Sequence, residues 1–233
     1  MLEIKDLSKS FDNVEVLNIS RLDIGKGELV GVVGNNGAGK TTLFRLCLDL
    51  LKAGDGNVFI ENKDVNRSEE WKKQTGAFID ERFLIDFLTP EEYFYFIGKL
   101  YGFSKTAVDE NLADFNKFMA DVILGNRNKY IEKLSKGNKQ KIGIIGAMIA
   151  HPELLILDEP FNFLDPSSQI EMKRILQKFN TEYGATVLLS SHNIQYVADI
   201  CSRIILLERG EIIRDERAVT SETKIELENY FRM

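Results

Sequence analysis

The sequence predicts an α/β protein with a parallel sheet, an N-terminal antiparallel β layer and an inserted α-helical lobe. Short apolar runs at Leu154–Leu157 and 186–189 each follow a helical stretch, and strands that alternate with helices form parallel sheets. Residues 2–24 show the alternation of apolar and polar side chains that is typical of half-buried strands. Residues 83–133 interrupt this β pattern with helix signals. These three observations together give the predicted fold class.

The first eighty residues are predicted to be mostly strands joined by tight turns. Asp12-Asn13 separates the strands 2–11 and 14–24, and Gly25-Lys26-Gly27 leads into the apolar run 29–33. The remaining expected elements of this part are a helix over 41–51 and short strands at 58–60 and 76–79. The antiparallel layer should therefore lean on the strand 29–33.

Clear start signals mark the helical lobe. Thr89 is a good N-cap, Pro90 suits the first helical turn, and two glutamates follow near the positive end of the helix dipole. Helices are expected over 91–101 and 105–120. After the lobe, the pattern predicts a hairpin of 204–207 with 211–213 around Arg209-Gly210, and a helical tail from Ser221.

Composition restricts the class of protein. The chain has 233 residues, of which 44% are apolar and 28% charged, as in ordinary globular proteins. The net charge of −6 gives no basic footprint for nucleic acid. No apolar run reaches the roughly 18 residues of a membrane span, and the start lacks a signal-peptide core, so a cytoplasmic protein is expected. Cys47 and Cys201 are expected to be reduced core thiols.

Residues 34–42, Gly-Asn-Asn-Gly-Ala-Gly-Lys-Thr-Thr, lie between a buried strand and a helix. Gly34, Gly37 and Gly39 let the backbone curl so that successive N–H groups point at phosphates. The helix adds its free N-terminal N–H groups and the positive end of its dipole. Lys40 can reach the terminal phosphates, and the Thr41 hydroxyl can bind Mg²⁺. The spacing is that of the phosphate-binding loop of P-loop NTPases, so we expect bound nucleotide.

Two carboxylates follow a buried strand at Asp158-Glu159. In parallel sheets the ligand crevice lies at the carboxyl ends of the strands. Asp158 is therefore placed to hold Mg²⁺ in the manner of a Walker B aspartate, and Glu159, on the opposite side of the strand period, can polarise a water aimed at the γ-phosphate. The alternative is a plain strand end, and the phosphate loop favours the functional interpretation.

From these residues onward, the chain resembles the nucleotide-binding subunits of ABC transporters. Residues 134–140, Leu-Ser-Lys-Gly-Asn-Lys-Gln, resemble the family signature Leu-Ser-Gly-Gly-Gln. The resemblance implies that Ser135 and the Gly137 N–H contact the γ-phosphate bound by a second subunit. Lys136 replaces a glycine and Asn138 the glutamine, and Lys136 could either add positive charge or crowd that interface.

Further positions match other motifs of the family. Asp165 corresponds to the D-loop aspartate that touches the partner's phosphate loop, and His192 to the switch histidine that contacts the γ-phosphate. Phe11 falls where an aromatic stacks on adenine, although a core phenylalanine at a strand end is an equal alternative. Asp80 takes the place of the Q-loop glutamine and is a candidate metal ligand, and the next residue, Glu81, is the alternative. His151, before Pro152, has no expected catalytic role.

The resemblance also implies a complete set of site residues. The nucleotide ligands would be Phe11, Asn35, Asn36, Gly37, Ala38, Gly39, Lys40, Thr41, Thr42, Ser135, Lys136, Gly137, Asn138 and Asp165, with Glu159 and His192 catalytic. The metal ligands would be Thr41, Asp80 and Asp158. The cofactors implied are ATP and Mg²⁺.

By the same resemblance, residues 1–233 form one ATP-binding domain with a RecA-like core. Residues 1–82 and 148–233 would form the β subdomain and core, and 83–147 the helical subdomain that carries the signature. The implied function is ATP hydrolysis that drives transport, as a dimer on the cytoplasmic face of a polytopic permease and most like the exporters. Two alternatives remain open: a soluble ABC-type ATPase, and a regulatory module that binds nucleotide without hydrolysing it.

Overall fold

The antiparallel layer at the N-terminus is a sheet of order β2-β1-β4-β5 in the computed structural model, which describes residues 1–124 and 128–232. Its strands are β1 (Leu2–Phe11), β2 (Val14–Ile24), β4 (Asp55–Ile60) and β5 (Lys63–Asp64). β1 pairs with β2 from Leu2↔Ile24 to Phe11↔Val14, so the predicted Asp12-Asn13 turn is confirmed. Both turn residues have positive φ, which asparagine and aspartate tolerate better than most side chains.

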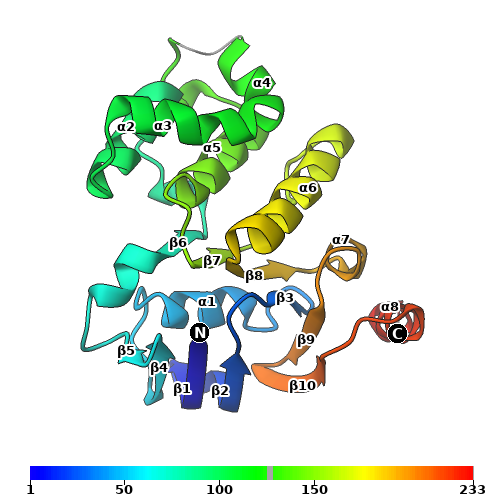
Figure 1. The fold of residues 1–233 in the computed structure, drawn as a ribbon. Helices are drawn as coiled ribbons and strands as arrows, with labels where there is room; N and C mark the ends of the chain where they lie inside the picture. The colour runs from blue at the N-terminus through cyan, green and yellow to red at the C-terminus, as the bar shows by residue number, and fades with distance from the viewer. Residues whose placement is uncertain (125–127, 233) are drawn as a thin grey trace.

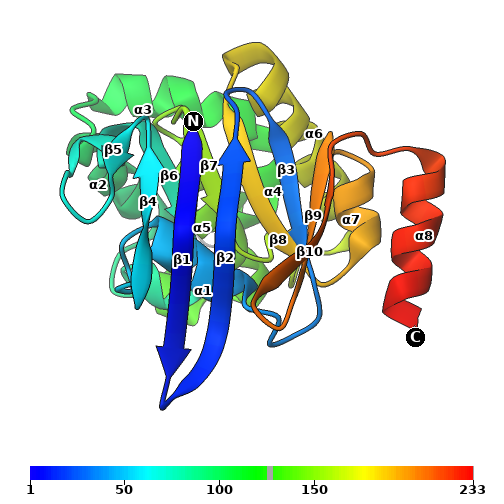
Figure 2. The same ribbon diagram turned by 90° about the horizontal axis from the view of Figure 1, so that it is seen from below.

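The larger sheet has the order β10-β9-β3-β8-β7-β6. Its strands are β3 (Leu29–Val33), β6 (Thr75–Phe78), β7 (Leu154–Leu157), β8 (Thr186–Ser191), β9 (Arg203–Glu208) and β10 (Glu211–Glu216). Neighbours from β9 to β6 are parallel, and β10 returns antiparallel beside β9. The predicted parallel sheet is confirmed, with β3, the strand that enters the phosphate loop, in a central position (Figure 2).

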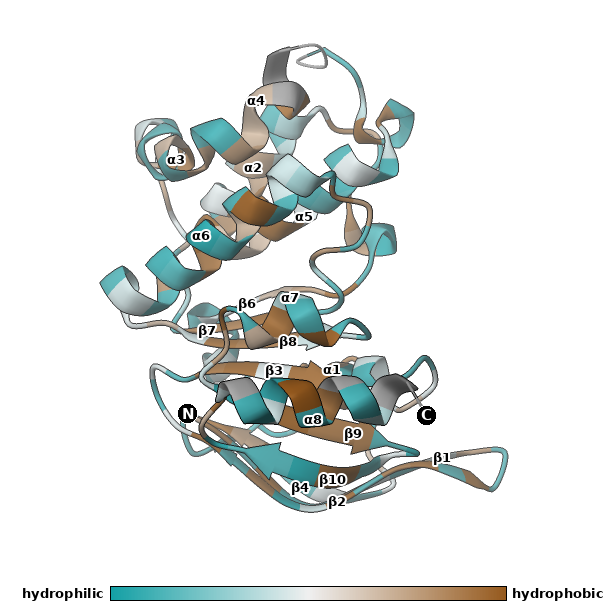
Figure 3. Cartoon of the chain, turned by 90° about the vertical axis from the view of Figure 1, so that its right-hand side faces the viewer, coloured by the Kyte–Doolittle hydropathy of each residue, from teal (hydrophilic) through white to brown (hydrophobic). Residues whose placement is uncertain are grey.

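Helix α1 (Lys40–Cys47) lies between the two sheets, as Figure 1 shows. The parallel strands are apolar along their whole length because they are buried on both faces. In β7, Leu154 and Ile156 join the core around α1, whereas Leu155 and Leu157 face the helices on the other side. In Figure 3 the strands of the central sheet are accordingly brown, while the outer strand β10 is largely teal.

The helices on the far face of the sheet form the predicted lobe, called here the helical lobe. It comprises α2 (Pro90–Leu100), α3 (Lys105–Leu112), α4 (Asn116–Leu124) and α5 (Lys136–Met148). The N-cap predicted at Thr89 is confirmed, since its side chain accepts from the Glu92 N–H, and the Glu92 carboxylate accepts in turn from the Thr89 N–H to form a capping box. Among the described residues, no helix is both long and apolar enough to cross a membrane.

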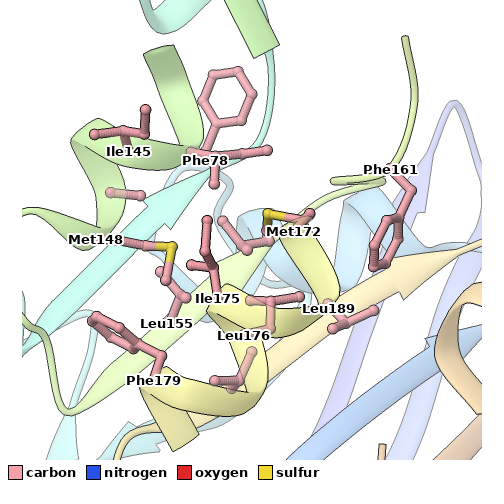
Figure 4. Close-up of a cluster of buried hydrophobic side chains, with 14 of the residues drawn as sticks. Phe78, Ile145, Met148, Leu155, Phe161, Met172, Ile175, Leu176, Phe179 and Leu189 are labelled. Atoms are coloured by element: carbon pink, nitrogen blue, oxygen red, sulfur yellow. The ribbon is translucent and has the colours of Figure 1, made fainter. Parts of the chain in front are cut away.

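A second hydrophobic core, on the side of the sheet away from α1, joins the helical lobe to the sheet. Figure 4 shows its centre, where Met172, Leu176 and Phe179 of α6 (Pro166–Tyr183) gather beside Leu155 and other apolar side chains. The chain ends in α7 (Ile194–Ala198) and α8 (Ser221–Arg232), and Leu227 of α8 is fully buried. Cys47 and Cys201 are buried too, and burial raises the pKa of the Cys47 thiol to about 12.

Several predicted boundaries were wrong. The helix expected over 105–120 is broken by a 3₁₀ turn, Ala113–Phe115, which sends Phe115 into the core before α4 begins. The first helix ends at Cys47 rather than at residue 51, and β8 continues through two buried serines to Ser191. Phe115 and the two serines are buried by the packing of distant segments, which the local pattern does not show.

Candidate functional site

The phosphate loop, residues 34–42, leaves the carboxyl end of β3 and turns directly into α1. Gly37 and Gly39 have φ of +83° and +106°, values that residues with a Cβ rarely adopt. Asn35, Asn36 and Gly37 are exposed, and the Lys40 ammonium folds back onto the carbonyls of Gly34 and Asn35, at 2.7 and 3.2 Å. The loop thus combines an exposed backbone with the buried ammonium of Lys40.

Two distant segments support this loop. The Gly210 N–H, in the turn between β9 and β10, donates to the Ala38 carbonyl at 2.9 Å. The Gly210 carbonyl accepts from the Asn18 N–H on β2, also at 2.9 Å. A cavity of about 220 Å³ lies alongside, lined by the loop from Asn35 to Ala38, the end of β9, Arg209, and Tyr230 of α8. The C-terminal hairpin is therefore part of the wall of the site.

Thr41 and Asp158 come together as predicted. The Thr41 hydroxyl, in the first turn of α1, donates to Asp158 Oδ2 at 2.5 Å, and Asp158 stands just beyond β7. Ser190 of β8 donates to the other carboxylate oxygen of Asp158. Burial raises the pKa of Asp158, and these two hydroxyl donors offset part of that rise. A hydroxyl and a carboxylate side by side are hard oxygen donors, which suit Mg²⁺ completed by phosphate and water.

The direction of the Glu159 side chain is set by its own backbone conformation and not by the alternation of side chains along a strand. Its φ is +46°, so the expectation that it simply alternates with Asp158 along the strand was wrong. The left-handed residue turns the side chain toward the loop. Glu159 Oε1 is 3.5 Å from Lys40 Nζ, and Oε2 is 2.9 Å from His192 Nδ1. Lysine, glutamate and histidine from three strand ends thus form one connected group.

The signature, residues 134–140, begins helix α5. Ser135 is its N-cap, and its hydroxyl accepts from the Asn138 N–H at 3.3 Å. A Cβ on Gly137 would lie 2.7 Å from the Phe163 carbonyl oxygen, so only glycine fits there without displacing that backbone. The Lys136 ammonium lies 5.1 Å from the centre of the Phe163 ring. Lys136, which departs from the family signature, therefore contacts the exposed ring of Phe163.

Asp165 has a clear structural role. It is the N-cap of α6 and accepts from the Ser168 N–H at 3.0 Å and from the Ser167 and Ser168 hydroxyls at 2.5 and 2.7 Å. These hydrogen bonds, with Ser167 first, lower the pKa of Asp165. The sequence carried this signal, since aspartate before a proline that opens a helix is a common helix start.

Asp80 is occupied by a neighbouring arginine. Arg82 Nε and Nη2 donate to its two carboxylate oxygens at 3.0 and 2.8 Å, and the hydrogen bond to Arg82 is the main cause that lowers the pKa of Asp80. Asp80 lines a cavity of about 310 Å³ that Asp158 and Glu159 also line. Arg82 thus competes with a metal for the oxygens of Asp80.

Phe11 ends β1 beside the hairpin turn and is 46% exposed. Its ring lies 5.1 Å from the Lys9 ammonium. The core alternative is wrong, because the side chain is not buried. An exposed ring at this place is free to meet a flat ligand, and stacking on adenine stays a prediction.

Sequence reasoning missed two residues that hold the site together. Gln140 of α5 donates through Nε2 to the Glu159 carbonyl at 3.2 Å, and Ser190 Oγ accepts from the Glu159 N–H at 2.8 Å. Both side chains are buried. Ser190 stands two residues before His192, so its place at a strand end was the only signal available.

A glycine loop between a buried strand and a helix, with an acidic strand end beside it, defines a nucleotide-binding α/β protein. Residues 17–162 match the ABC transporter family. The chain therefore belongs to that family, as the ATP-binding subunit of a transporter.

Curated relatives of this chain include proteins of different transport systems. The ABC transporter ATP-binding protein NatA of Bacillus subtilis is 34% identical over 91% of this chain and 88% of its own length. The methionine import ATP-binding protein MetN 3 of Oceanobacillus iheyensis is 30% identical, over 96% of this chain and 68% of its own length. The lantibiotic transport ATP-binding protein SrtF of Streptococcus pyogenes is 33% identical over 98% of this chain and 96% of its own length.

A solved structure has the same fold. The dimeric bacterial ABC transporter cassette MJ0796 superimposes with a TM-score of 0.83 at 26% identity, over 95% of this chain and 100% of that one. The same cassette, as a dimer in a post-hydrolysis state bound to ADP and Pi, gives a TM-score of 0.81. The predicted fold class is confirmed.

Proposed function

We propose that this chain hydrolyses ATP and that hydrolysis powers movement of a substrate through a membrane partner. The observation that carries the proposal is the connected group Lys40–Glu159–His192 beside the Thr41–Asp158 pair. It puts a cation, a carboxylate and an imidazole next to a loop shaped for phosphates. A module that only binds nucleotide needs the loop but has no use for the other two groups.

The reaction is in-line attack of water on the γ-phosphorus, with cleavage of the bond to the β–γ bridging oxygen to give ADP and phosphate. Glu159 orients the attacking water. The His192 Nδ1 contact to Glu159 holds the imidazole ring, so that its other nitrogen is presented to the γ-phosphate. Both side chains come from carboxyl ends of parallel strands, where the sheet places its ligand crevice.

Lys40 and the loop N–H groups offset the charge that develops on the phosphoryl oxygens. Thr41 and Asp158 fit Mg²⁺, which when bound neutralises charge on the β- and γ-phosphates. Asn35, Asn36, Ala38 and Thr42 complete the loop that holds the triphosphate. Asp80 is the remaining candidate metal ligand, and its carboxylate also binds Arg82.

Two copies of the chain would sandwich ATP between them. In this arrangement Ser135, Lys136, Gly137, Asn138 and Asp165 of one copy complete the site of the other. The exposed Ser135 hydroxyl at the N-terminus of α5, and a structural neighbour whose cassette is dimeric, support the proposal. ATP would close the pair and hydrolysis would reopen it.

The helical lobe is the proposed contact with a polytopic membrane subunit on the cytoplasmic face. Large apolar side chains are exposed on the lobe and on the segments that flank its helices, and exposed apolar surface of this kind suits a protein interface. They are Phe96 and Leu100 of α2, with Phe83, Phe87 and Tyr130 in the flanking segments, and Phe87 is 73% exposed.

Export is the proposed direction. The proposal rests on the likeness to the lantibiotic transport relative, which is 33% identical over 98% of this chain. Cells that lack the chain should be more sensitive to a cationic lantibiotic peptide. Wild-type chain should restore resistance, and the Glu159→Gln variant should not; equal sensitivity of all strains would exclude export of such peptides.

ATPase measurements with the full chain, alone and with its membrane partner, test hydrolysis. Glu159→Gln keeps the size of the side chain but removes the carboxylate that orients water, so it should bind MgATP, accumulate as a dimer and lose turnover. Thr181→Ala, which removes an exposed hydroxyl bonded within α6 to the Gln177 carbonyl, is the control and should keep turnover. Wild-type turnover no higher than that of Glu159→Gln would show a regulatory module instead.

A further inference from the structure

The peptide unit of Glu159 is fixed on both sides. Its N–H donates to the Ser190 hydroxyl at 2.8 Å. Its carbonyl accepts from the Asn162 N–H at 3.1 Å, within the following turn, and from Gln140 Nε2 at 3.2 Å. Ser190 belongs to the central sheet and Gln140 to α5 of the helical lobe, so the two side chains reach this peptide from opposite parts of the molecule (Figure 1).

This peptide needs such support. A φ of +46° is unfavourable for any residue with a side chain, and a glutamate persists there only if its surroundings hold it. Relaxation to negative φ would swing the carboxylate away from Lys40 and His192, which it now contacts at 3.5 and 2.9 Å. The position of the catalytic carboxylate is therefore a property of the backbone.

Gln140 and Ser190 suit this role because they are buried and already oriented. Ser190 is fully buried, and its hydroxyl both accepts from the Glu159 N–H and donates to Asp158. Gln140 is 8% exposed and lies about one turn after Gly137, which itself touches the backbone of Phe163. Neither residue contacts the phosphate loop through a hydrogen bond that the structure shows for the described residues.

We propose that Gln140 and Ser190 are positioning residues for ATP hydrolysis, which hold the Glu159 peptide in its left-handed conformation and thereby aim the catalytic carboxylate. The inference rests on the proposed ATPase activity. Because Gln140 belongs to α5 and Ser190 to β8, these two hydrogen bonds connect Glu159 to both the helical lobe and the sheet. Removing either hydrogen bond should slow the chemical step without weakening ATP binding.

Steady-state kinetics of the full chain test the proposal. Gln140→Met keeps the length of the side chain but has no N–H donor. It should lower kcat roughly tenfold or more, because a displacement of about 1 Å at a reacting group can cost about a hundredfold, and leave KM for ATP unchanged. Ser190→Ala should lower kcat as well, and because it also removes the donor to Asp158 its Mg²⁺ requirement is measured alongside. Ser190→Thr, which keeps the hydroxyl, should restore kcat. Because Gln140 and Ser190 are substituted separately, one variant still tests the proposal if the other fails to fold.

A matched control and a double-mutant cycle separate positioning from stability. Asn111→Leu is the control, because the Asn111 side-chain amide also donates a hydrogen bond to a backbone carbonyl, that of Ile149 at 2.8 Å. Losing this hydrogen bond should lower the melting temperature but not kcat. In a Glu159→Gln background, Gln140→Met should not lower the residual single-turnover rate further, because residues acting through one group are not additive.

The proposal is overturned, while the ATPase assignment stands, if folded Gln140→Met and Ser190→Ala both keep the wild-type kcat. It is also overturned if Gln140→Met lowers the rate as much in the Glu159→Gln background as in the wild-type chain. A wild-type rate equal to that of Glu159→Gln overturns both.

Discussion

At the scale of single residues, Asp158 combines a functional position with an unfavourable environment. It is buried, and burial raises its pKa, although Thr41 and Ser190 donate to it. A carboxylate with a raised pKa makes the folded chain less stable wherever it is charged, because folding then disfavours the ionised form. The arrangement is understandable if a divalent cation completes it.

Asp158→Asn tests this balance. At pH 7, without nucleotide or metal, the variant should melt at or above the wild-type temperature, because asparagine carries no buried charge. The difference should shrink as the pH falls through the raised pKa of Asp158, where the wild-type carboxyl becomes neutral. In MgATP the order should reverse, with a higher Mg²⁺ requirement in the variant. Thermal melts at several pH values, and Mg²⁺ titrations of ATP binding, measure both effects.

The residues that sequence reasoning identified stand where local order predicts them. The phosphate loop, Asp158 and His192 each follow an apolar strand, and the carboxyl ends of parallel strands meet. Gln140, Ser190 and the Arg82 contact to Asp80 could not be predicted, because they depend on how elements far apart in sequence pack. The direction of Glu159 depends on one left-handed backbone angle, which no periodicity reveals.

At the scale of elements, the contact between α5 and β6 is unusually close. A Cβ on Gly76 would lie 1.9 Å from the Ala147 carbonyl oxygen. The obstacle is backbone, so no side-chain rotation relieves it. The short strand β6 therefore packs directly on the helix that carries the signature.

Gly76→Ala should lower the free energy of unfolding by about 1–3 kcal/mol, the usual cost of overpacking. The neighbouring Ala77 is exposed, so Ala77→Ser should change it by less than about 0.5 kcal/mol. Urea denaturation of the three chains measures both values. A Gly76→Ala chain as stable as wild type would contradict the packing described here.

The helix cap at Asp165 gives a second prediction for an element. Asp165→Ala removes the cap of α6 and should cost about 0.5–2 kcal/mol of stability, whereas Asp165→Asn keeps an acceptor and should cost much less. If both variants lose ATP-dependent dimerisation while only alanine loses stability, the charge acts at the partner. Urea denaturation and size-exclusion chromatography with MgATP make the comparison; equal stability of the two variants would show that the cap contributes little.

At the scale of the whole molecule, the two cores share the strands of the parallel sheet, so each depends on the other. The fold class could be predicted because patterns such as the alternation in 2–24 repeat over many residues. The element boundaries could not all be predicted, because the break before α4 accompanies the burial of Phe115 in the core.

Nucleotide should stabilise the whole chain. MgATP at a hundred times its dissociation constant should add about 2.7 kcal/mol, because only the folded state binds it. Glu159→Gln should show the same gain, since it affects turnover, while Lys40→Ala should show little. Melting curves with and without MgATP measure this, and an equal gain in Lys40→Ala would place the triphosphate elsewhere.

The Gly210 turn has a consequence for the order of folding events. The phosphate loop looks local, since residues 34–42 are contiguous, yet the Ala38 carbonyl accepts from the Gly210 amide, which lies far away along the chain. The loop is therefore braced only after a contact of high sequence separation has formed. During refolding, retention of a fluorescent ATP analogue should appear no earlier than protection of the Gly210 amide from hydrogen exchange. Retention before that protection would show that the loop needs no brace.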